Sequence, residues 1–287
     1  MASIEKNINQ LNIPSTTYNE GSKILFAHAN GYPPACYDPL FNLLSDFQIT
    51  AIHQRPLWED SKPEEIKDWN PLTDDLLDFM DAENMGKVIG VGHSLGGIAL
   101  LRAAMREPKR FSSVILLDPV LFPPFFIRTW NILRILNLIA SIHPLIQATR
   151  GRRRVFQSRE SLSKSYRRKS VFRYFSDDAL EAYVNGITCP LEDGRFKLCY
   201  SPEWEVQIYI TGVWPDMEIW KNLPKLEVPL LIIRGSETDT FFESTGRLVT
   251  KKLPSARIVN IEKSTHLLPL EQPEAVKNEI QKFLSTL

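Results

Sequence analysis

VGHSLGG, at residues 91–97, is the stretch that decides the predicted fold, because it follows a β-branched run at residues 87–91 and leads into a helical pattern at residues 98–105. It has the spacing G-x-S-x-G, which places a serine on a strained turn between a strand and a helix. Flanking glycines let neighbouring backbone approach without Cβ clashes. The Leu95 N–H and the positive end of the helix then face the space beside the hydroxyl. We therefore predict that Ser94 is a nucleophile.

Short β-branched runs alternate with helical patterns on both sides of this stretch. That alternation is typical of a mostly parallel sheet with helices on both faces, an α/β fold. The predicted strands are residues 23–28, 47–53, 87–91, 113–117, 228–234 and 256–261. The predicted helices are residues 37–45, 71–83, 98–105, 241–252 and 273–284.

The alternation stops between residues 119 and 223, a segment that we call the insert. A segment of this length is too long for a plain loop. We expect a helical cap, without a sheet of its own, over the strand ends where ligands bind in open α/β sheets. Residues 1–118 and 224–287 are then the core.

A serine hydroxyl needs a base to take its proton. His266 follows the last predicted strand on a loop before the terminal helix, which fits the chain order serine, acid, histidine. We predict that His266 is that base. His93 is expected to point away from Ser94, and His53 and His143 are expected to be ordinary polar residues.

The acid that orients His266 has three candidates. After the fifth predicted strand comes GSETD at residues 235–239, and a carboxylate there is expected to fix the imidazole tautomer. Asp239 is the preferred residue, with Asp118 and Glu237 as alternatives. Asp118 also has a structural interpretation, because Asp-Pro at a strand end turns the chain.

A second donor to the oxyanion is expected from the loop HANGYPP at residues 28–34. Gly31 lets the backbone swing, so that the N–H of Tyr32 joins that of Leu95 in facing a substrate carbonyl oxygen.

The chain resembles the α/β-hydrolase family along nearly its whole length. The runs that carry the resemblance are HANGYPP at residues 28–34, RPLW at 55–58, VGHSLGG at 91–97, RGSETD at 234–239 and STH at 264–266. The insert is similar to the cap of an esterase-like branch, with its Arg-rich run, DDALEAYV helix and PEWE at residues 202–205. One departure is that Ala29 and Asn30 separate His28 from Gly31, where many members have His-Gly.

The resemblance implies a serine hydrolase that cleaves carboxylic esters through an acyl-enzyme. A serine at residue 94 argues against the aspartate-nucleophile dehalogenases and epoxide hydrolases of the family. Carbon–carbon bond hydrolases, cofactor-free perhydrolases, hydroxynitrile lyases and a slow-turnover ligand receptor remain open alternatives. No metal or organic cofactor is implied. The predicted pocket residues are Phe122, Trp130 and Trp204, for which the alternative is packing between cap and core.

Composition limits the partners. Lys+Arg and Asp+Glu number 34 each, so no overall attraction to nucleic acid is indicated. Residues 150–169 nevertheless carry nine basic side chains and one acidic, which indicates either an anion or membrane-surface patch or a solvated face paired with nearby acids. The longest apolar stretch, residues 122–146, is broken by prolines and arginines and is a poor membrane span.

The three cysteines are too few and too scattered for a disulfide framework or a zinc site. Residues 1–10 show no secretory signal. We therefore expect a cytoplasmic protein, monomeric or homodimeric, that acts on a small-molecule ester.

Overall fold

The computed structural model describes residues 3–4, 7–8 and 11–287, so the expectation that residues 1–10 hold no secretory signal falls partly outside the described residues. Eight strands of the described chain form one sheet in the order β1-β4-β6-β5-β7-β8-β12-β13. All neighbours from β6 to β13 are parallel, and β4 and β1 add an antiparallel edge. The strands are β1 (Ser3–Ile4), β2 (Asn7–Ile8), β3 (Leu11–Asn12), β4 (Ser15–Tyr18), β5 (Ser22–Ala27), β6 (Phe47–Ile52), β7 (Val88–His93), β8 (Phe111–Leu117), β9 (Val155–Phe156), β10 (Thr188–Pro190), β11 (Phe196–Leu198), β12 (Leu230–Gly235) and β13 (Arg257–Ile261).

The six predicted strands are all confirmed, each to within two residues at either end. These strands are easy to recognise in the sequence, because parallel strands that are covered on both faces are continuous runs of apolar residues. In β5, Ile24 and Phe26 join one buried cluster, and Leu25 and Ala27 join the other. The sheet is therefore the wall between two cores.

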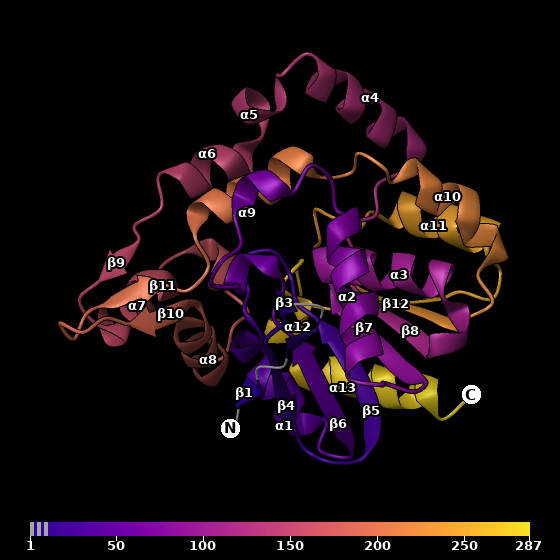
Figure 1. Cartoon of the computed structure of the whole chain (residues 1–287), viewed down its shortest axis with the longest axis horizontal. Helices are drawn as coiled ribbons and strands as arrows, with labels where there is room; N and C mark the ends of the chain where they lie inside the picture. Colours follow the sequence, from indigo (N-terminus) through magenta and orange to yellow (C-terminus); the bar gives the residue numbers. More distant parts are fainter. Residues whose placement is uncertain (1–2, 5–6, 9–10) are drawn as a thin grey trace.

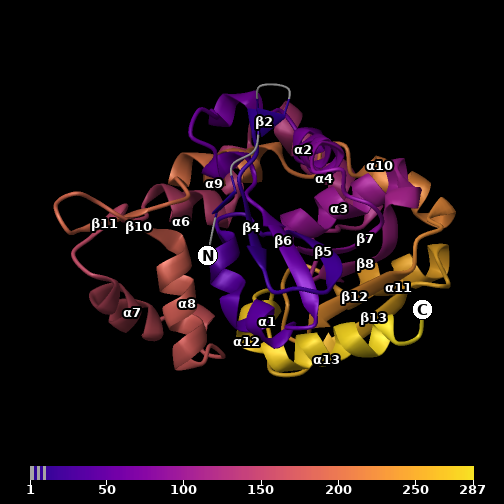
Figure 2. The same cartoon turned by 60° about the horizontal axis from the view of Figure 1, so that its bottom comes forward.

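Helices cover both faces of this wall. Figure 2 shows α2 and α3 on one side of the sheet and α1, α12 and α13 on the other. The terminal helix has the predicted bounds, and α3 begins at Leu95, earlier than predicted. The helices are α1 (Asp38–Leu43), α2 (Asn70–Ala82), α3 (Leu95–Arg106), α4 (Pro124–Ile135), α5 (Ile139–Ile142), α6 (Pro144–Arg150), α7 (Arg159–Arg167), α8 (Asp177–Ile187), α9 (Pro202–Thr211), α10 (Met217–Asn222), α11 (Glu243–Lys252), α12 (Leu268–Glu271) and α13 (Pro273–Leu284). Every helix in the described part of the chain is too short or too polar to cross a bilayer.

The insert runs from α4 to α10 along the top and one side of the molecule (Figure 1). The expectation that it has no sheet is wrong, because β10, β11 and β9 pair in an antiparallel three-stranded sheet. Each strand has only two or three residues, which is too short for an alternating pattern to be read.

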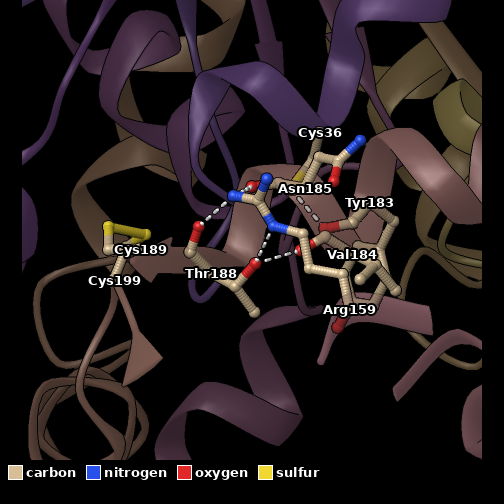
Figure 3. Close-up of a disulfide and its surroundings, with 8 residues drawn as sticks. All are labelled: Cys36, Arg159, Tyr183, Val184, Asn185, Thr188, Cys189 and Cys199. Carbon is tan, nitrogen blue, oxygen red and sulfur yellow. Dashed lines mark hydrogen bonds between the residues drawn. A yellow bond between two sulfur atoms is a disulfide. The ribbon is translucent and has the colours of Figure 1, made fainter. Parts of the chain in front are cut away.

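Cys189 and Cys199 form a disulfide across this small sheet (Figure 3), a pairing that was not expected from three cysteines judged too few and too scattered for a disulfide framework. The pairing of β10 with β11 brings the two residues together, and the Cys199 N–H donates to Ile187 O at 2.9 Å. Arg159 holds the adjoining turn by donating to the Thr188 hydroxyl and carbonyl. Cys36 is buried and free.

Candidate active site

Ser94 lies on the turn between β7 and α3 in a strained backbone conformation, with φ of 56°. Close packing requires this turn to be glycine-rich. A Cβ on Gly96 would lie 2.2 Å from Ala27 O, and one on Gly92 would lie 2.7 Å from the Gly96 backbone. The helix starts directly after Ser94, so the first N–H groups of α3 face the hydroxyl's surroundings.

A chain of hydrogen bonds joins Ser94, His266 and Asp118. Ser94 Oγ lies 2.9 Å from His266 Nε2, and His266 Nδ1 lies 2.7 Å from Asp118 Oδ2. Because the Asp118 carboxylate only accepts, the imidazole carries its proton on Nδ1 and accepts from the serine hydroxyl through Nε2. The expected contact between Ser94 and His266 is therefore present.

The expected contact between Asp239 and His266 is wrong, and Asp118 occupies that place. Asp239 is exposed, and its carboxylate accepts from the neighbouring Thr240 hydroxyl. Glu237 is also exposed and is bound by Arg173 and Tyr174 of the insert.

The sheet order gives the physical reason. β8 lies between β7 and β12, and the ladder continues past the strand ends. The Ser94 N–H donates to Leu117 O, and the Asp118 N–H donates to Ile233 O. Asp118 is therefore beside Ser94 as soon as β8 ends, whereas the loop after β12 carries Asp239 outward. The chain order serine, acid, histidine is kept.

The loop after β12 still contributes to the site, through donors instead of a carboxylate. Thr238 Oγ1 donates to Asp118 Oδ2 at 2.6 Å, and the Gly235 N–H donates to Oδ1 at 3.2 Å. Asp118 is fully buried and has a φ of 41°. Its charge is thus held in place by three donors, and a strained backbone is tolerated here as at Ser94.

His93 does more than the sequence suggested. Its Nε2–H donates to His266 O at 2.8 Å, its Nδ1 accepts from the Tyr37 hydroxyl at 2.7 Å, and that hydroxyl accepts from the Ala29 N–H. Burial, and then the nearby His266, hold the pKa of His93 well below its usual value. A neutral His93 therefore links the turn at Ser94, the loop at His266 and the loop after β5. No spacing in the sequence signals this link, because Tyr37 reaches it from a separate turn.

In the loop after β5, the backbone N–H that lacks an acceptor is not the expected one. The Tyr32 N–H donates to Ala29 O at 3.2 Å, so the assignment of Tyr32 as an oxyanion donor is wrong. Gly31 has a φ of 80° and closes this turn. The Asn30 N–H has no acceptor among the described residues.

The insert holds the side chain of Asn30. Its Oδ1 accepts from the Tyr200 hydroxyl at 2.7 Å, and its Nδ2 donates to Glu205 O at 3.2 Å. The Tyr209 hydroxyl is a third partner. Glu205 is buried, its carboxylate is paired with Arg152 at 2.6 Å, and burial raises its pKa. The loop after β5 is thus fixed from the insert side.

The three predicted pocket residues have different surroundings. Trp204 is buried in the core cluster that includes α2 and α3. Phe122 and Trp130 are half-buried in a row of rings. Successive members of that row lie 4.3 to 5.4 Å apart between ring centroids, and they are Phe122, Phe126, Trp130, His143 and Tyr209. The row reaches Asn30 through Tyr209. Among the described residues, no three His, Cys, Asp or Glu side chains form a group that could hold a metal.

Comparison with known proteins fits this geometry. The sequence model described as "Alpha/beta hydrolase family" matches residues 24–279. The esterase YbfF of Escherichia coli is 21% identical over 85% of each chain. A Bacillus subtilis protein named as a putative 2-succinyl-6-hydroxy-2,4-cyclohexadiene-1-carboxylate synthase is 23% identical over 74% of this chain and 71% of its own. The crystal structure of E-2-(acetamidomethylene)succinate hydrolase superposes with a TM-score of 0.79 over 99% of both chains, at 21% identity.

Proposed function

The chain belongs to the alpha/beta hydrolase family, and on this premise we propose that it is a serine hydrolase that cleaves carboxylic esters. The observation that carries the proposal is the hydrogen-bonded chain from Ser94 through His266 to the buried Asp118. A similarity to an esterase over 85% of each chain agrees with it.

In the proposed mechanism, Ser94 Oγ attacks the ester carbonyl while its proton passes to His266 Nε2. Asp118 stabilises the imidazolium that forms and keeps Nδ1 protonated. The N–H groups of Leu95 and Asn30 stabilise the oxyanion, with Asn30 replacing Tyr32 because its N–H has no other acceptor among the described residues. His266 then protonates the departing alcohol, and water repeats the sequence to release the acid.

We propose that the insert acts as a cap that sets substrate preference. Its contacts with Asn30 and the row of rings from Phe122 to Tyr209 support this role. Aromatic surface favours moderately hydrophobic esters, and the basic segment favours an anionic group on them. Phe122 and Trp130 remain the proposed contacts for the apolar part, and Trp204 supports the cap from within the core.

The test is hydrolysis of p-nitrophenyl esters, from acetate through decanoate, by the wild type and Ser94→Ala. We expect turnover to fall by about 10⁴-fold or more in the variant, because one triad member removes most of the covalent pathway. The chain length of the best ester measures the pocket. A preference for the shortest neutral ester would contradict the apolar cap, and unchanged turnover in Ser94→Ala would reject the mechanism.

Carbon–carbon bond hydrolysis on the same three residues is the second candidate, because one fold of this family can carry more than one reaction on a serine nucleophile. It predicts weak ester turnover and rapid cleavage of a vinylogous diketone, whereas a perhydrolase predicts activity with peroxide and acetate. A slow receptor predicts tight binding with turnover far below the usual range of about 1–10³ s⁻¹.

We keep the cytoplasm as the proposed location, with a small-molecule ester and no nucleic acid as partner, and a monomer or homodimer as the assembly. The disulfide makes the location testable, because such bonds are rare in reducing compartments. Alkylation of intact cells followed by mass spectrometry tests whether the Cys189–Cys199 pair of the structure forms in the cell, and free thiols at both residues would support the cytoplasm. A fully oxidised pair would place the protein in an oxidising compartment.

A further inference from the structure

The outer helices of the insert expose apolar side chains to an unusual extent. Of the twelve large apolar side chains that are exposed in the described chain, seven lie on or between α4, α5 and α6. Figure 1 shows α4 and α5 at the outer edge of the molecule, on the far side of the sheet from α13. We call this the α4–α6 surface, and its apolar members are Phe125, Ile132, Ile135, Leu136, Leu138, Ile142 and Leu145.

Helical spacing places much of this exposure on one face of α4. Phe125, Ile132 and Ile135 are exposed by 80%, 58% and 68%, and they follow one another at seven and three residues. The opposite side holds the buried Ile127 and the ring row. Packing within the insert therefore accounts for one side of α4 only. Exposed apolar side chains gathered on one face of a helix in this way mark an interaction site.

The charge of the same segment is one-sided. Residues 119–159 contain seven arginines and no aspartate or glutamate. Four of the arginines have partners, with Arg134 and Arg159 on carbonyls and Arg152 and Arg154 on glutamates. The other three are exposed and have no carboxylate partner among the described residues, and they are Arg128, Arg150 and Arg153.

We propose that the α4–α6 surface docks on an anionic lipid bilayer. Helices that lie in a membrane interface combine an apolar face with basic residues, which meet acidic headgroups while the apolar side chains enter the acyl boundary. The exposed isoleucines and leucines supply the first feature, and the three unpaired arginines supply the second. Docking does not depend on the chemistry at Ser94.

A second copy of the chain fits this surface less well. A two-fold contact brings the same patch from both copies together. Here that contact would bury unpaired arginines against one another, with no carboxylate in residues 119–159 to neutralise them. An anionic bilayer supplies the missing negative charge.

Sedimentation with lipid vesicles tests the proposal on the full chain. Vesicles of phosphatidylcholine and phosphatidylglycerol in equal parts should bind the protein, and vesicles of phosphatidylcholine alone should bind it at least about tenfold more weakly. Binding to the mixed vesicles should fall as salt is raised.

Two matched pairs of variants separate the contributions. Ile132→Ser with Ile135→Ser should weaken vesicle binding at least about tenfold, while Val171→Ser with Phe242→Ser, which are exposed elsewhere, should not. Changing the three unpaired arginines to glutamine should abolish the preference for anionic lipid. The control for that charge change is glutamine at three exposed lysines, Lys23, Lys109 and Lys251. All these side chains are exposed, so unchanged thermal unfolding serves as the check on folding.

Three results would overturn the proposal. The first is no binding to either kind of vesicle. The second is an equal loss of vesicle binding in the Ile132/Ile135 variant and in its Val171/Phe242 control. The third is a concentration-dependent dimer in sedimentation velocity that the Ile132/Ile135 variant disperses, which would assign the surface to a second copy.

Discussion

The ends of β8 and β12 present the same chemistry with opposite outcomes. Both are buried parallel strands, side by side in the sheet, and each is followed by an aspartate. Asp118 comes directly after β8, is fully buried and contacts His266. Asp239 comes four residues after Gly235, is exposed and contacts its neighbour Thr240. The position of the strand in the sheet and the length of the loop thus decide which carboxylate meets the imidazole.

In the sheet, β7, β8 and β12 are neighbours, and they lie beneath the insert (Figure 1). Ser94 follows β7 and His266 follows β13, so β8 and β12 both lie between the proposed nucleophile and base. Because Asp118 follows β8 directly, its carboxylate lies in the interior. A buried charge without partners would be costly, so its hydrogen bonds hold it in a fixed geometry. The loop after β12 is left to donate hydrogen bonds to Asp118 through Thr238 and Gly235.

The largest expected effect comes from exchanging the two carboxylates for amides. Asp118→Asn should lower kcat for an ester by about 10⁴-fold, because an amide at this position favours the wrong imidazole tautomer. Asp239→Asn should leave kcat within about twofold, since an exposed side chain away from the site is changed. Steady-state kinetics of both variants on one p-nitrophenyl ester measure the difference. Equal losses, or a larger loss in Asp239→Asn, would reverse the comparison.

A third strand end extends the comparison to stability. His28 follows β5, is fully buried, and its Nε2 accepts from the Gln54 N–H. Burial lowers its pKa to about 3. Since the folded pKa lies below the ordinary value of about 6.5, its contribution to stability is present above pH 6.5 and is lost as the pH falls toward 3.

The cost of His28→Asn in free energy of unfolding should therefore be smaller at pH 5 than at pH 7, by about 2 kcal/mol. Urea unfolding of wild type and variant at both values gives this difference. Gln54→Ala, which alters the same loop without a titrating group, should cost the same at both. A cost of His28→Asn that does not change with pH would mean that the pKa of His28 is the same in the folded and the unfolded chain.

Much of the fold was readable from the sequence for a physical reason. Each strand of the parallel region is a buried run of Val, Ile and Leu between turns, so its pattern needs no tertiary information. The contact between Ser94 and His266 was predictable as well, because the turn at Ser94 is a local motif and the loop with His266 follows the last strand.

The acid and the oxyanion loop were not readable, because both depend on contacts between segments. Whether Asp118 or Asp239 contacts His266 depends on the order of strands in the sheet. The spacing of residues along the chain does not contain that order. The Tyr32 N–H, which was expected to face the substrate, instead donates to Ala29 O in a turn. Asn30 is held by the insert, through a hydrogen bond from Tyr200, 170 residues away in the chain. The strands of the insert were too short for any pattern.

The smallest expected effect concerns the hydroxyl that supports Asp118. Thr238→Val removes the 2.6 Å hydrogen bond to Oδ2 and should lower kcat about tenfold, as expected for one hydrogen bond to a charged group. Thr240→Val removes the matching contact to Asp239 and should have no effect on kcat. A loss in both variants would indicate disturbance of the whole loop after β12.

The central claim is that Ser94 forms an acyl-enzyme with the help of His266 and Asp118. The most direct measurement is the intact mass of the protein quenched in acid during turnover of p-nitrophenyl acetate, followed by peptide mapping. We predict one acetyl group on Ser94 in the wild type, its slow formation in Asp118→Asn and its absence in Ser94→Ala. Product release at the full rate without an adduct on Ser94, or an adduct on another residue that accounts for turnover, would contradict the account.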